Sequence, residues 1–395
     1  MSFQVQVIPK DKSSSQYQLF HFSNSSYGVN IEHSALDGMR DVLLTDLGSV
    51  TFLDRDRTQG GAADPAPLGD GGNLTIDRVT EVHLHQHALE GWRGAHSVVW
   101  IRNVETCRVD GAALAATTSV RRLLLENITS LVLARDAFQA SVGELVLRNV
   151  TIAECPRGAL GGRIERLRFD SSTLRTVRAG CLRVRPGTRL LSLSHSRLGR
   201  VSTDAISGRA DDVTVRHCKI DAVATGGVRL NTTRLSLLEA DVAELRPDAL
   251  QVDAAQSVSL HALRISGRLH AGALRGLRVV GAQGSSLNIT GLRVARAEPG
   301  SLQLAPGTAV HARELELDIH KECSEEWGGA HTHSVYVPSA WQSAAPLDGC
   351  QSRLEDFFRP LFECDFQAAL NETQSDSGTD GQQLTCARKE DDLLD

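Results

Sequence analysis

The sequence is poor in aromatic residues and in lysine. Aromatic side chains make up 4% of its 395 residues, so its interior must be filled by small and branched aliphatic side chains. This composition is more typical of a stack of thin repeated layers than of a globular core filled by large aromatic side chains. A stack of layers also escapes the size limit that would divide an ordinary chain of this length into two or three domains. Lysine accounts for five of the 42 basic residues, so arginine carries nearly all of the positive charge.

Long apolar runs are also absent. No stretch of about 18 apolar residues occurs, so the chain as given is not expected to span a membrane. The opening segment MSFQVQVIPKDKSSSQYQLF has no apolar core of the length that a signal peptide requires. Because the glycosylation motifs described next point to the secretory pathway, we expect the start of the chain to be incomplete or misassigned.

Asparagine is rare, but it is concentrated in one motif. Seven of the nine asparagines stand in Asn-X-Ser/Thr sequons without proline at X, whereas chance would produce about 1.3 among nine. Such an excess is typical of a protein that folds in the endoplasmic reticulum and carries surface glycans. The predicted glycosylation sites are Asn24, Asn73, Asn127, Asn149, Asn231, Asn288 and Asn371.

Apolar residues recur at a steady spacing between about residues 41 and 320. Each unit holds an alternating L-x-L, a second apolar pair and a final A-L, A-I or A-F, separated by polar or glycine-containing corners. The alternation predicts short strands with one face inward, and no stretch has the periodicity of a helix. The period itself predicts stacked supersecondary units. Equivalent positions lie 22, 22, 24, 22, 22 and 23 residues apart at Leu125, Leu147, Phe169, Leu193, Val215, Leu237 and Leu260.

Three short strands in a turn of 22 to 24 residues are the arrangement of a parallel β-helix. The segment STDAISGRADDVTVRHCKIDAVATGGVRL resembles the coils of the right-handed parallel β-helix superfamily, to which the pectate lyases belong. The resemblance covers residues 41–320 and implies an all-β, right-handed parallel β-helix solenoid, but no particular activity.

A leucine-rich-repeat solenoid is the alternative fold, because its L-x-x-L-x-L-x-x-N/C-x-L pattern has a similar period. Two features of this chain favour the β-helix. The Asn or His usually comes two residues after the second leucine, as at Asn127 and His195, and not three. The leading leucine of the pattern is also often replaced by a polar or small residue, as at Thr188.

The ends of the chain differ from the repeats. We expect a lead-in or cap at residues 1–40, the solenoid at 41–320, a cap rich in cysteine and aromatic residues at 321–370, and an acidic disordered tail at 371–395. In an oxidising compartment, disulfides in one of three connectivities would staple the C-terminal cap. The candidate cysteines of the cap are Cys323, Cys350, Cys364 and Cys386. The coils hold four more, predicted to be buried free thiols or coil-to-coil bridges: Cys107, Cys155, Cys181 and Cys218.

The resemblance also raises the alternative of a carbohydrate-active enzyme, either a polysaccharide lyase or a glycoside hydrolase. Hydrolysis with inversion uses two carboxyl groups about 6.5 to 9.5 Å apart, and Asp204, Asp211 and Asp212 are the obvious candidates. Asp204, however, recurs at a corner that also holds Asp136 and Asp248, and the other two precede a predicted strand. All three candidates are therefore interpreted as turn residues. The Gly-His-Gly and Arg-Ile-Lys motifs of the hydrolases are absent, and no catalytic residue is assigned.

Three histidines, His83, His85 and His87, alternate along one predicted strand. Residues two apart in a strand are about 6.6 Å apart, whereas a Zn–N bond is only about 2.1 Å. At most two of these histidines can therefore share an ion. Because the sequence shows no third ligand, they are interpreted as a surface histidine stripe, and no metal site is assigned.

The centre of the sequence is strongly positive. Between Arg157 and Arg200 it holds 11 arginines and two acidic residues. Arginines on successive coils, about 4.8 Å apart, can form ladders of bidentate donors for sulfated or uronic-acid glycans; the alternative is a solvated face in which arginine replaces lysine. Nucleic acid is not an expected partner, because no aromatic platform interleaves with the arginines. The polyanion-binding candidates are Arg166, Arg168, Arg183, Arg185, Arg197 and Arg216.

The sequence therefore predicts a secreted or cell-surface N-glycoprotein that needs no cofactor. It is expected to act as a non-catalytic interaction or scaffold protein, which presents a long lateral surface to an extracellular protein or an acidic glycan.

Overall fold

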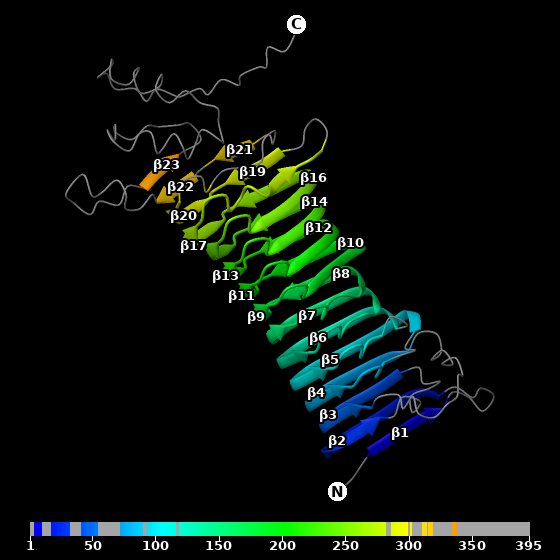
Figure 1. The fold of residues 1–395 in the computed structure, drawn as a ribbon. Helices are drawn as coiled ribbons and strands as arrows, with labels where there is room; N and C mark the ends of the chain where they lie inside the picture. The colour runs from blue at the N-terminus through cyan, green and yellow to red at the C-terminus, as the bar shows by residue number, and fades with distance from the viewer. Residues whose placement is uncertain are drawn as a thin grey trace, which may run out of the picture. The chain divides into compact units, whose positions relative to one another are not determined.

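The structure is a computed structural model of the 395-residue chain. It describes residues 4–9, 17–31, 41–53, 72–89, 93–115, 118–281, 286–298, 301, 310–313, 315–318 and 334–337. This described part consists of β-strands joined by turns and contains no helix (Figure 1). It thus holds no helix of the length and apolar character that crossing a membrane requires. The chain divides into two compact units, Met1–Cys218 and Lys219–Asp395.

In the first unit, strands of successive turns pair in parallel. Leu123 pairs with Leu145, which pairs with Leu167, so that equivalent residues stack 22 positions apart. The exception is β1, which runs antiparallel to β2. The strands are β1 Gln4–Pro9, β2 Tyr17–Ile31, β3 Asp41–Phe52, β4 Asn73–Leu84, β5 Arg93–Val109, β6 Ser119–Leu133, β7 Ser141–Cys155, β8 Arg163–Asp170, β9 Thr173–Val177, β10 Leu182–Ser194, β11 Arg197–Val201 and β12 Ile206–Arg216.

The second unit repeats the same arrangement. Leu230 pairs with Val252, which pairs with Leu277, and all three side chains are buried. Its one antiparallel pair among the described strands joins β22 and β23. The strands are β13 Lys219–Val223, β14 Val228–Leu238, β15 Asp241–Leu245, β16 Leu250–His261, β17 Arg264–Leu269, β18 Leu277–Val279, β19 Ser286–Thr290, β20 Arg293–Ala297, β21 Val310–Arg313, β22 Leu315–Asp318 and β23 Ser334–Val337.

The parallel β-solenoid that the sequence predicts is confirmed in both units, while its right-handed winding stays a prediction. A leucine-rich repeat contributes one strand and commonly a helix in each turn. Here β8 pairs with β10 in a first sheet, and β9 pairs with β11 in a second sheet. The pairing of β10 with β12 is broken between Val184 and Thr188, so that with β11 one turn holds three paired segments, as predicted. Three such segments, without a helix in the described residues, exclude the leucine-rich-repeat alternative.

A left-handed backbone residue marks the corner between the first and second sheets. Asparagine, aspartate and histidine tolerate this conformation better than most residues, and they fill most of the positions. The first corner of the first unit holds residues with φ between 49° and 61°: Asn24, Asp46, Arg78, Asn103, Asn127, Asn149, Ser171, His195 and His217.

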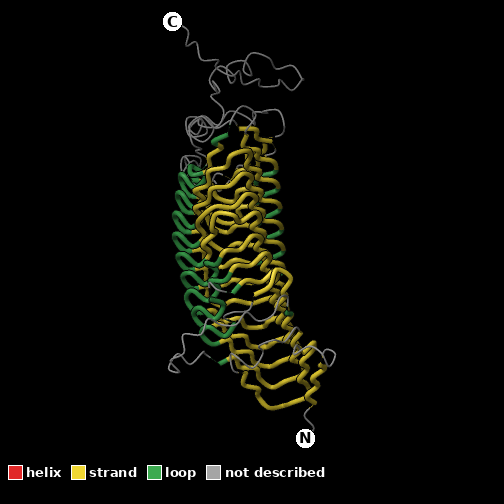
Figure 2. Tube along the Cα trace, turned by 90° about the vertical axis from the view of Figure 1, so that its right-hand side faces the viewer, coloured by secondary structure: helices red, strands yellow, loops and turns green. Residues whose placement is uncertain are grey.

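A second corner follows the second sheet in each turn. Gly158 and Gly180 occupy it with φ of 71° and 69°. The corner predicted at Asp136, Asp204 and Asp248 is confirmed, with φ of 55°, 54° and 51°. In Figure 2 the turns (green) of successive coils lie one above another beside the strands (yellow).

Apolar side chains, most of them aliphatic, are stacked in register and fill the interior. Ile76, Ile101, Leu125, Leu147 and Phe169 occupy equivalent positions on five successive turns, and each is at most 1% exposed. Burying a side chain of this size contributes about 1.5 to 3 kcal/mol. The inward face is therefore occupied by packing, and polar side chains concentrate on the outer face and at the corners.

The terminal segments are described only in part. Within residues 1–40, β2 pairs in parallel with β3 from Leu19 and Asp41 onward. Within residues 321–370 the described strand is β23. The four cap cysteines, Asn371 and the predicted acidic tail lie outside the described residues.

Candidate functional site

Charged side chains form a column of alternating sign on the outer face of the first sheet. The register places Asp77, Arg102, Glu126, Arg148 and Asp170 at equivalent positions of successive turns. Arg102 Nη2 lies 3.0 Å from Asp77 Oδ2. Arg148 reaches Glu126 Oε1 on one side and Asp170 Oδ2 on the other, both at 3.2 Å. We call these five residues the outer charge column.

The carboxylates of the outer charge column neutralise the charges of its arginines. Hydrogen bonds that Arg148 donates to Glu126 and Asp170 raise the pKa of its guanidinium. Asp77 is 3% exposed and accepts hydrogen bonds from Arg78 Nη1 and Asn103 Nδ2, both at 2.7 Å. The pairs of Arg148 with Glu126 and Asp170 are partly exposed and contribute at most about 1 kcal/mol each. Their larger effect is on the surface charge, because these arginines already have anionic partners.

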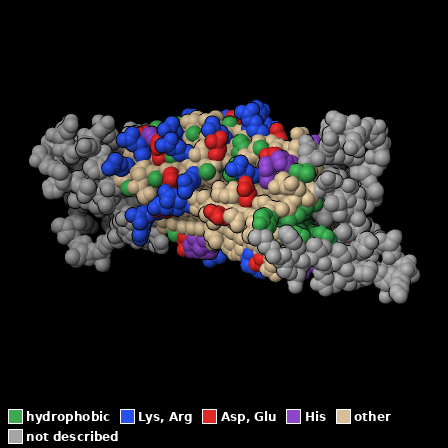
Figure 3. Space-filling view, turned by 90° about the horizontal axis from the view of Figure 1, so that it is seen from below, with side chains coloured by type: hydrophobic (Ala, Val, Ile, Leu, Met, Phe, Trp, Pro, Cys, Tyr) green, Lys and Arg blue, Asp and Glu red, His purple; other side chains and the backbone are tan. Residues whose placement is uncertain are grey.

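The structure places all six predicted polyanion-binding arginines on the surface of the first unit, at positions of β8, β10, β11 and β12. The register does not stack them on one another. Arg166 lies between Glu144 and Leu190, and Arg168 lies between Val146 and Ser192. On the face drawn in Figure 3, Lys and Arg side chains (blue) are accordingly interspersed with Asp and Glu side chains (red).

The six arginines differ in how their guanidinium groups are engaged. Arg168 Nε lies 3.4 Å from Glu144 Oε1, and Arg185 Nε donates to the carbonyl of Gly161 at 2.7 Å. Arg197 is also engaged in an interaction. The remaining three are exposed, and within the described residues no carboxylate forms an ion pair with them. These three arginines, which we call the open arginines, are Arg166, Arg183 and Arg216.

Sequon asparagines occupy two kinds of place. Asn24, Asn127 and Asn149 stand at the first corner, where the left-handed backbone favours asparagine. The other described sequon asparagines lie on strands with ordinary φ: Asn73 at the start of β4, Asn231 on β14 and Asn288 on β19. All of them are exposed except Asn288, which is half-buried.

The corner asparagines form a hydrogen-bonded ladder. Asn149 Nδ2 donates to Asn127 Oδ1 at 3.0 Å, and Asn127 Nδ2 donates to Asn103 Oδ1 at 2.9 Å. The residue after each corner is buried, and the next one faces outward, where a strand favours threonine. The repeat therefore produces Asn-apolar-Thr at residues 127 and 149 for a structural reason, whether or not a glycan is attached.

The three carboxylates considered for polysaccharide hydrolysis are not gathered at one corner. Asp204 stands at the second corner, as predicted. The interpretation of Asp211 and Asp212 as turn residues is wrong, because both lie inside β12. Asp212 pairs with Leu190 on the neighbouring turn. The strand that the sequence predicts to begin at Val213 therefore begins earlier, at Ile206.

The three histidines of the predicted stripe do not all lie on β4. This strand ends at Leu84, so that His83 is its last outward residue and His85 directly follows it. The two rings lie side by side, with centroids 3.8 Å apart. His87 stands at the second corner with a φ of 59°, outside the strand. The structure thus brings two of the three histidines together.

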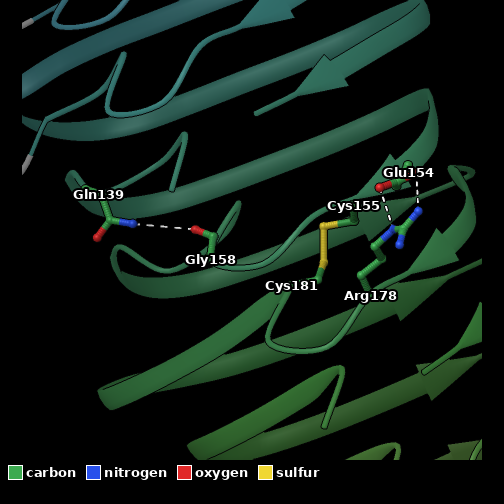
Figure 4. The surroundings of a disulfide bond; sticks show 6 residues. All are labelled: Gln139, Glu154, Cys155, Gly158, Arg178 and Cys181. Carbon is green, nitrogen blue, oxygen red and sulfur yellow. Dashed lines mark hydrogen bonds and ion pairs between the residues drawn. A yellow bond between two sulfur atoms is a disulfide. The ribbon is translucent and has the colours of Figure 1, made fainter. Parts of the chain in front are cut away.

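Two coil cysteines join consecutive turns. Cys155, at the end of β7, and Cys181, in the turn before β10, form a buried disulfide with Cα atoms 5.6 Å apart (Figure 4). Beside it Arg178 Nη2 donates to Glu154 Oε2 at 3.0 Å across the same two turns. The prediction of a bridge or thiols at these positions is confirmed, although the sequence did not show which cysteines pair.

The other two described cysteines are buried thiols, Cys107 and Cys218. Burial raises the pKa of Cys107 to about 12 and also raises that of Cys218. A thiol in this state is a packing residue and a poor nucleophile, because the thiolate is the reactive form.

Comparison of the chain with protein families, with curated proteins and with solved structures finds no match. Its function is therefore argued from its own residues and their geometry. The sequence did not show which charged residues pair in the outer charge column, although acidic residues and arginines alternate there at steps of 22 to 25 residues.

Proposed function

We propose that the chain is a non-catalytic glycoprotein of the secretory pathway, a member of the right-handed parallel β-helix superfamily that works outside the cell or at its surface. In this proposal the solenoid is a scaffold, and the open arginines bind an acidic glycan. The observation that carries the proposed compartment is the buried disulfide between consecutive turns.

Two independent features support the oxidising compartment. Disulfides are rare in reducing compartments unless they are catalytic or redox-sensing, and Cys155 and Cys181 are both buried. The left-handed first corner explains asparagine at three sequons, but it does not apply to Asn73, Asn231 and Asn288. Asn73 has a structural role of its own, because its Nδ2 donates to Asp41 Oδ1 at 2.8 Å. Asn231 and Asn288 therefore support glycosylation more strongly than the corner sequons do.

The open arginines support recognition of an anionic polymer. Arginine offers paired donors that match sulfate and carboxylate groups. The strands that carry Arg166, Arg183 and Arg216 belong to a parallel stack with a spacing of about 4.8 Å per turn. An extended, charged polymer fits such a surface better than a compact ligand does, because the arginines are distributed over several turns.

Retention on a sulfated-glycan column of heparin tests the binding. The variant R166Q/R183Q/R216Q is expected to elute at lower salt than the parent. Three lost contacts of about 0.5 to 1 kcal/mol each correspond to roughly 10- to 100-fold weaker binding. The matched control is R102Q/R122Q/R148Q, which also removes three arginines, all of them already paired with carboxylates, and should change elution less. Equal elution of the triple variant and the parent would remove the glycan-binding proposal.

Peptide mass spectrometry of protein recovered from the medium of secreting cells tests the compartment. We expect a glycan on Asn73 or Asn231, and the peptides that hold Cys155 and Cys181 joined until a reductant is added. Retention of the protein inside the cells, with these asparagines unmodified and the thiols free, would contradict the proposal. This outcome is independent of the heparin experiment, which uses purified protein.

A further inference from the structure

Two histidine rings converge on one carboxylate oxygen at the boundary between two turns of the first unit. His83 Nε2 and His85 Nδ1 each lie 3.1 Å from Asp110 Oδ2. The ring centroids are 3.8 Å apart, and the three possible ligand atoms all lie within 4.8 Å of one another. Within the described residues this is the one group of three His, Cys, Asp or Glu side chains close enough to hold a metal ion.

The register of the strands creates this group. Leu84 pairs with Val109 on the next turn, which places Asp110 beside His85. A backbone hydrogen bond of 2.9 Å from Asp110 N to Leu84 O fixes the relation of the two turns at this point. Because β4 ends at Leu84, the backbone leaves the strand between His83 and His85, and their rings need not keep the separation of two outward residues in a regular strand.

We propose that His83, His85 and Asp110 bind a Zn²⁺ ion on the outer face of the first unit. Two ligands about 2.1 Å from a tetrahedral ion lie roughly 3.4 Å apart, so the observed N···O separations need to change by only a few tenths of an ångström. Imidazole nitrogen and carboxylate oxygen are both ordinary zinc ligands. Three protein ligands leave the fourth position for water or for a donor atom of another molecule.

Exposure and charge suit an ion that enters from solvent. The side chains of His83, His85 and Asp110 are 25%, 35% and 42% exposed, so the site is open on one side. The nearby Arg108 would oppose a cation, but its Nε lies 3.6 Å from Glu81 Oε1, which offsets its charge. The carboxylate of Asp110 therefore faces the ion without an opposing unpaired guanidinium.

A histidine of the second unit shows the contrasting arrangement. His270 Nε2 lies 3.2 Å from Glu244 Oε1, and its Nδ1 lies 3.0 Å from Glu298 Oε1. This one ring lies between two carboxylates, and each of its nitrogens faces a different one. At His83 and His85, by contrast, one nitrogen of each ring lies 3.1 Å from the same carboxylate oxygen, so that two rings and one carboxylate meet at one place. His270 thus provides a matched control.

Zinc content of the full-length chain tests the proposal. The parent and its variants are stripped with a chelator, dialysed against Zn²⁺ and analysed for bound metal by mass spectrometry and titration calorimetry. H83A and H85A are expected to lose one equivalent of Zn²⁺ relative to the parent, and H270A is expected to lose none. Because each variant is compared with the parent, metal bound elsewhere in the chain does not affect the difference.

A conservative variant separates a metal ligand from a hydrogen-bond acceptor. D110N keeps the size of the side chain and an acceptor oxygen, but it removes the negative charge. We expect at least about tenfold weaker binding at this site, and loss of the Co²⁺ absorption band that the parent shows after Co²⁺ replaces Zn²⁺. Equal zinc content in the parent, H85A and D110N would overturn the proposal and leave the group as a hydrogen-bonded surface cluster.

Discussion

Removal of the Cys155–Cys181 disulfide should destabilise the turns that it joins. The two cysteines are 26 residues apart. The loop-closure relation gives an entropy of about 12 cal/mol/K for a loop of that length, or about 3.5 kcal/mol at 25 °C. The variant C155A/C181A also loses two buried sulfur atoms. A control must therefore remove the same atoms without breaking a bond, and C107A/C218A does so because both of its cysteines are buried thiols.

Urea unfolding followed by circular dichroism measures the difference. We expect a lower midpoint for C155A/C181A than for C107A/C218A. The difference between the two midpoints should equal about 3.5 kcal/mol divided by the slope of the unfolding free energy against urea concentration, when both variants have the same slope. Each repeat in a solenoid contacts mainly its neighbours, so the loss applies to the cooperative unit that contains β7 to β10. Equal midpoints for the two double variants would refute the reasoning that the bridge restrains the unfolded chain.

Three further predictions concern single residues of the first unit. Asn149→Val should lower the melting temperature, because a β-branched residue in a left-handed corner costs about 1 to 3 kcal/mol. Asn149→Gly should lower the melting temperature less, and equal melting temperatures of the two variants would contradict this prediction. Cys107 should react with iodoacetamide at pH 8 only after unfolding, since burial raises its pKa to about 12, and equal labelling rates of native and unfolded protein would show otherwise. A hydrogen bond from Arg78 lowers the pKa of Asp46 from its ordinary value of 3.8, so this carboxylate stabilises the fold above that value and the contribution is lost as pH falls through the lowered pKa. Asp46→Asn should therefore be less stable than the parent near about pH 6, and the difference should shrink as the pH is lowered below the ordinary value of 3.8. A constant difference in urea midpoint would count against the interaction.

The spacing of apolar residues was sufficient to predict the parallel solenoid. Leu125, Leu147 and Phe169 are 22 residues apart in the sequence, and the same residues stack in the structure. A constant spacing over many turns has few explanations other than stacked layers. The inward face could be predicted for the same reason, because alternation in a strand separates buried from exposed positions.

The partners of the charged residues could not be predicted in the same way. Arg102 stacks on Asp77 after 25 residues, and Arg148 stacks on Glu126 after 22. Asn73 stacks on Asp41 after 32, because the turn between them is longer. The offset thus depends on the length of each connection, which the apolar pattern does not determine. Without the register, the arginines appeared as one positive band.

The unknown register also explains why the sequence did not show Asp110 as the third residue of the histidine group. Asp110 is 25 residues from His85, and the two meet only because β4 ends at Leu84 and β5 at Val109. On one regular strand the three histidines would stay apart, and the alternation of the strand shows no third ligand near them. In a solenoid, the nearest neighbour of an outward side chain is often on the adjacent turn, one period away.

The glycan-binding and zinc-binding proposals therefore depend on different turns and can fail separately. His85 lies at the end of β4, and Arg166 and Arg216 lie on β8 and β12. Several turns, each about 4.8 Å high, separate the two places, and salt screens exposed charges beyond about 8 Å at physiological ionic strength. H85A should accordingly lose zinc and keep the heparin elution of the parent, and R166Q/R183Q/R216Q should do the reverse. A change of both properties in either variant would show that the two surfaces are coupled through the stack, contrary to the nearest-neighbour behaviour expected of repeated layers.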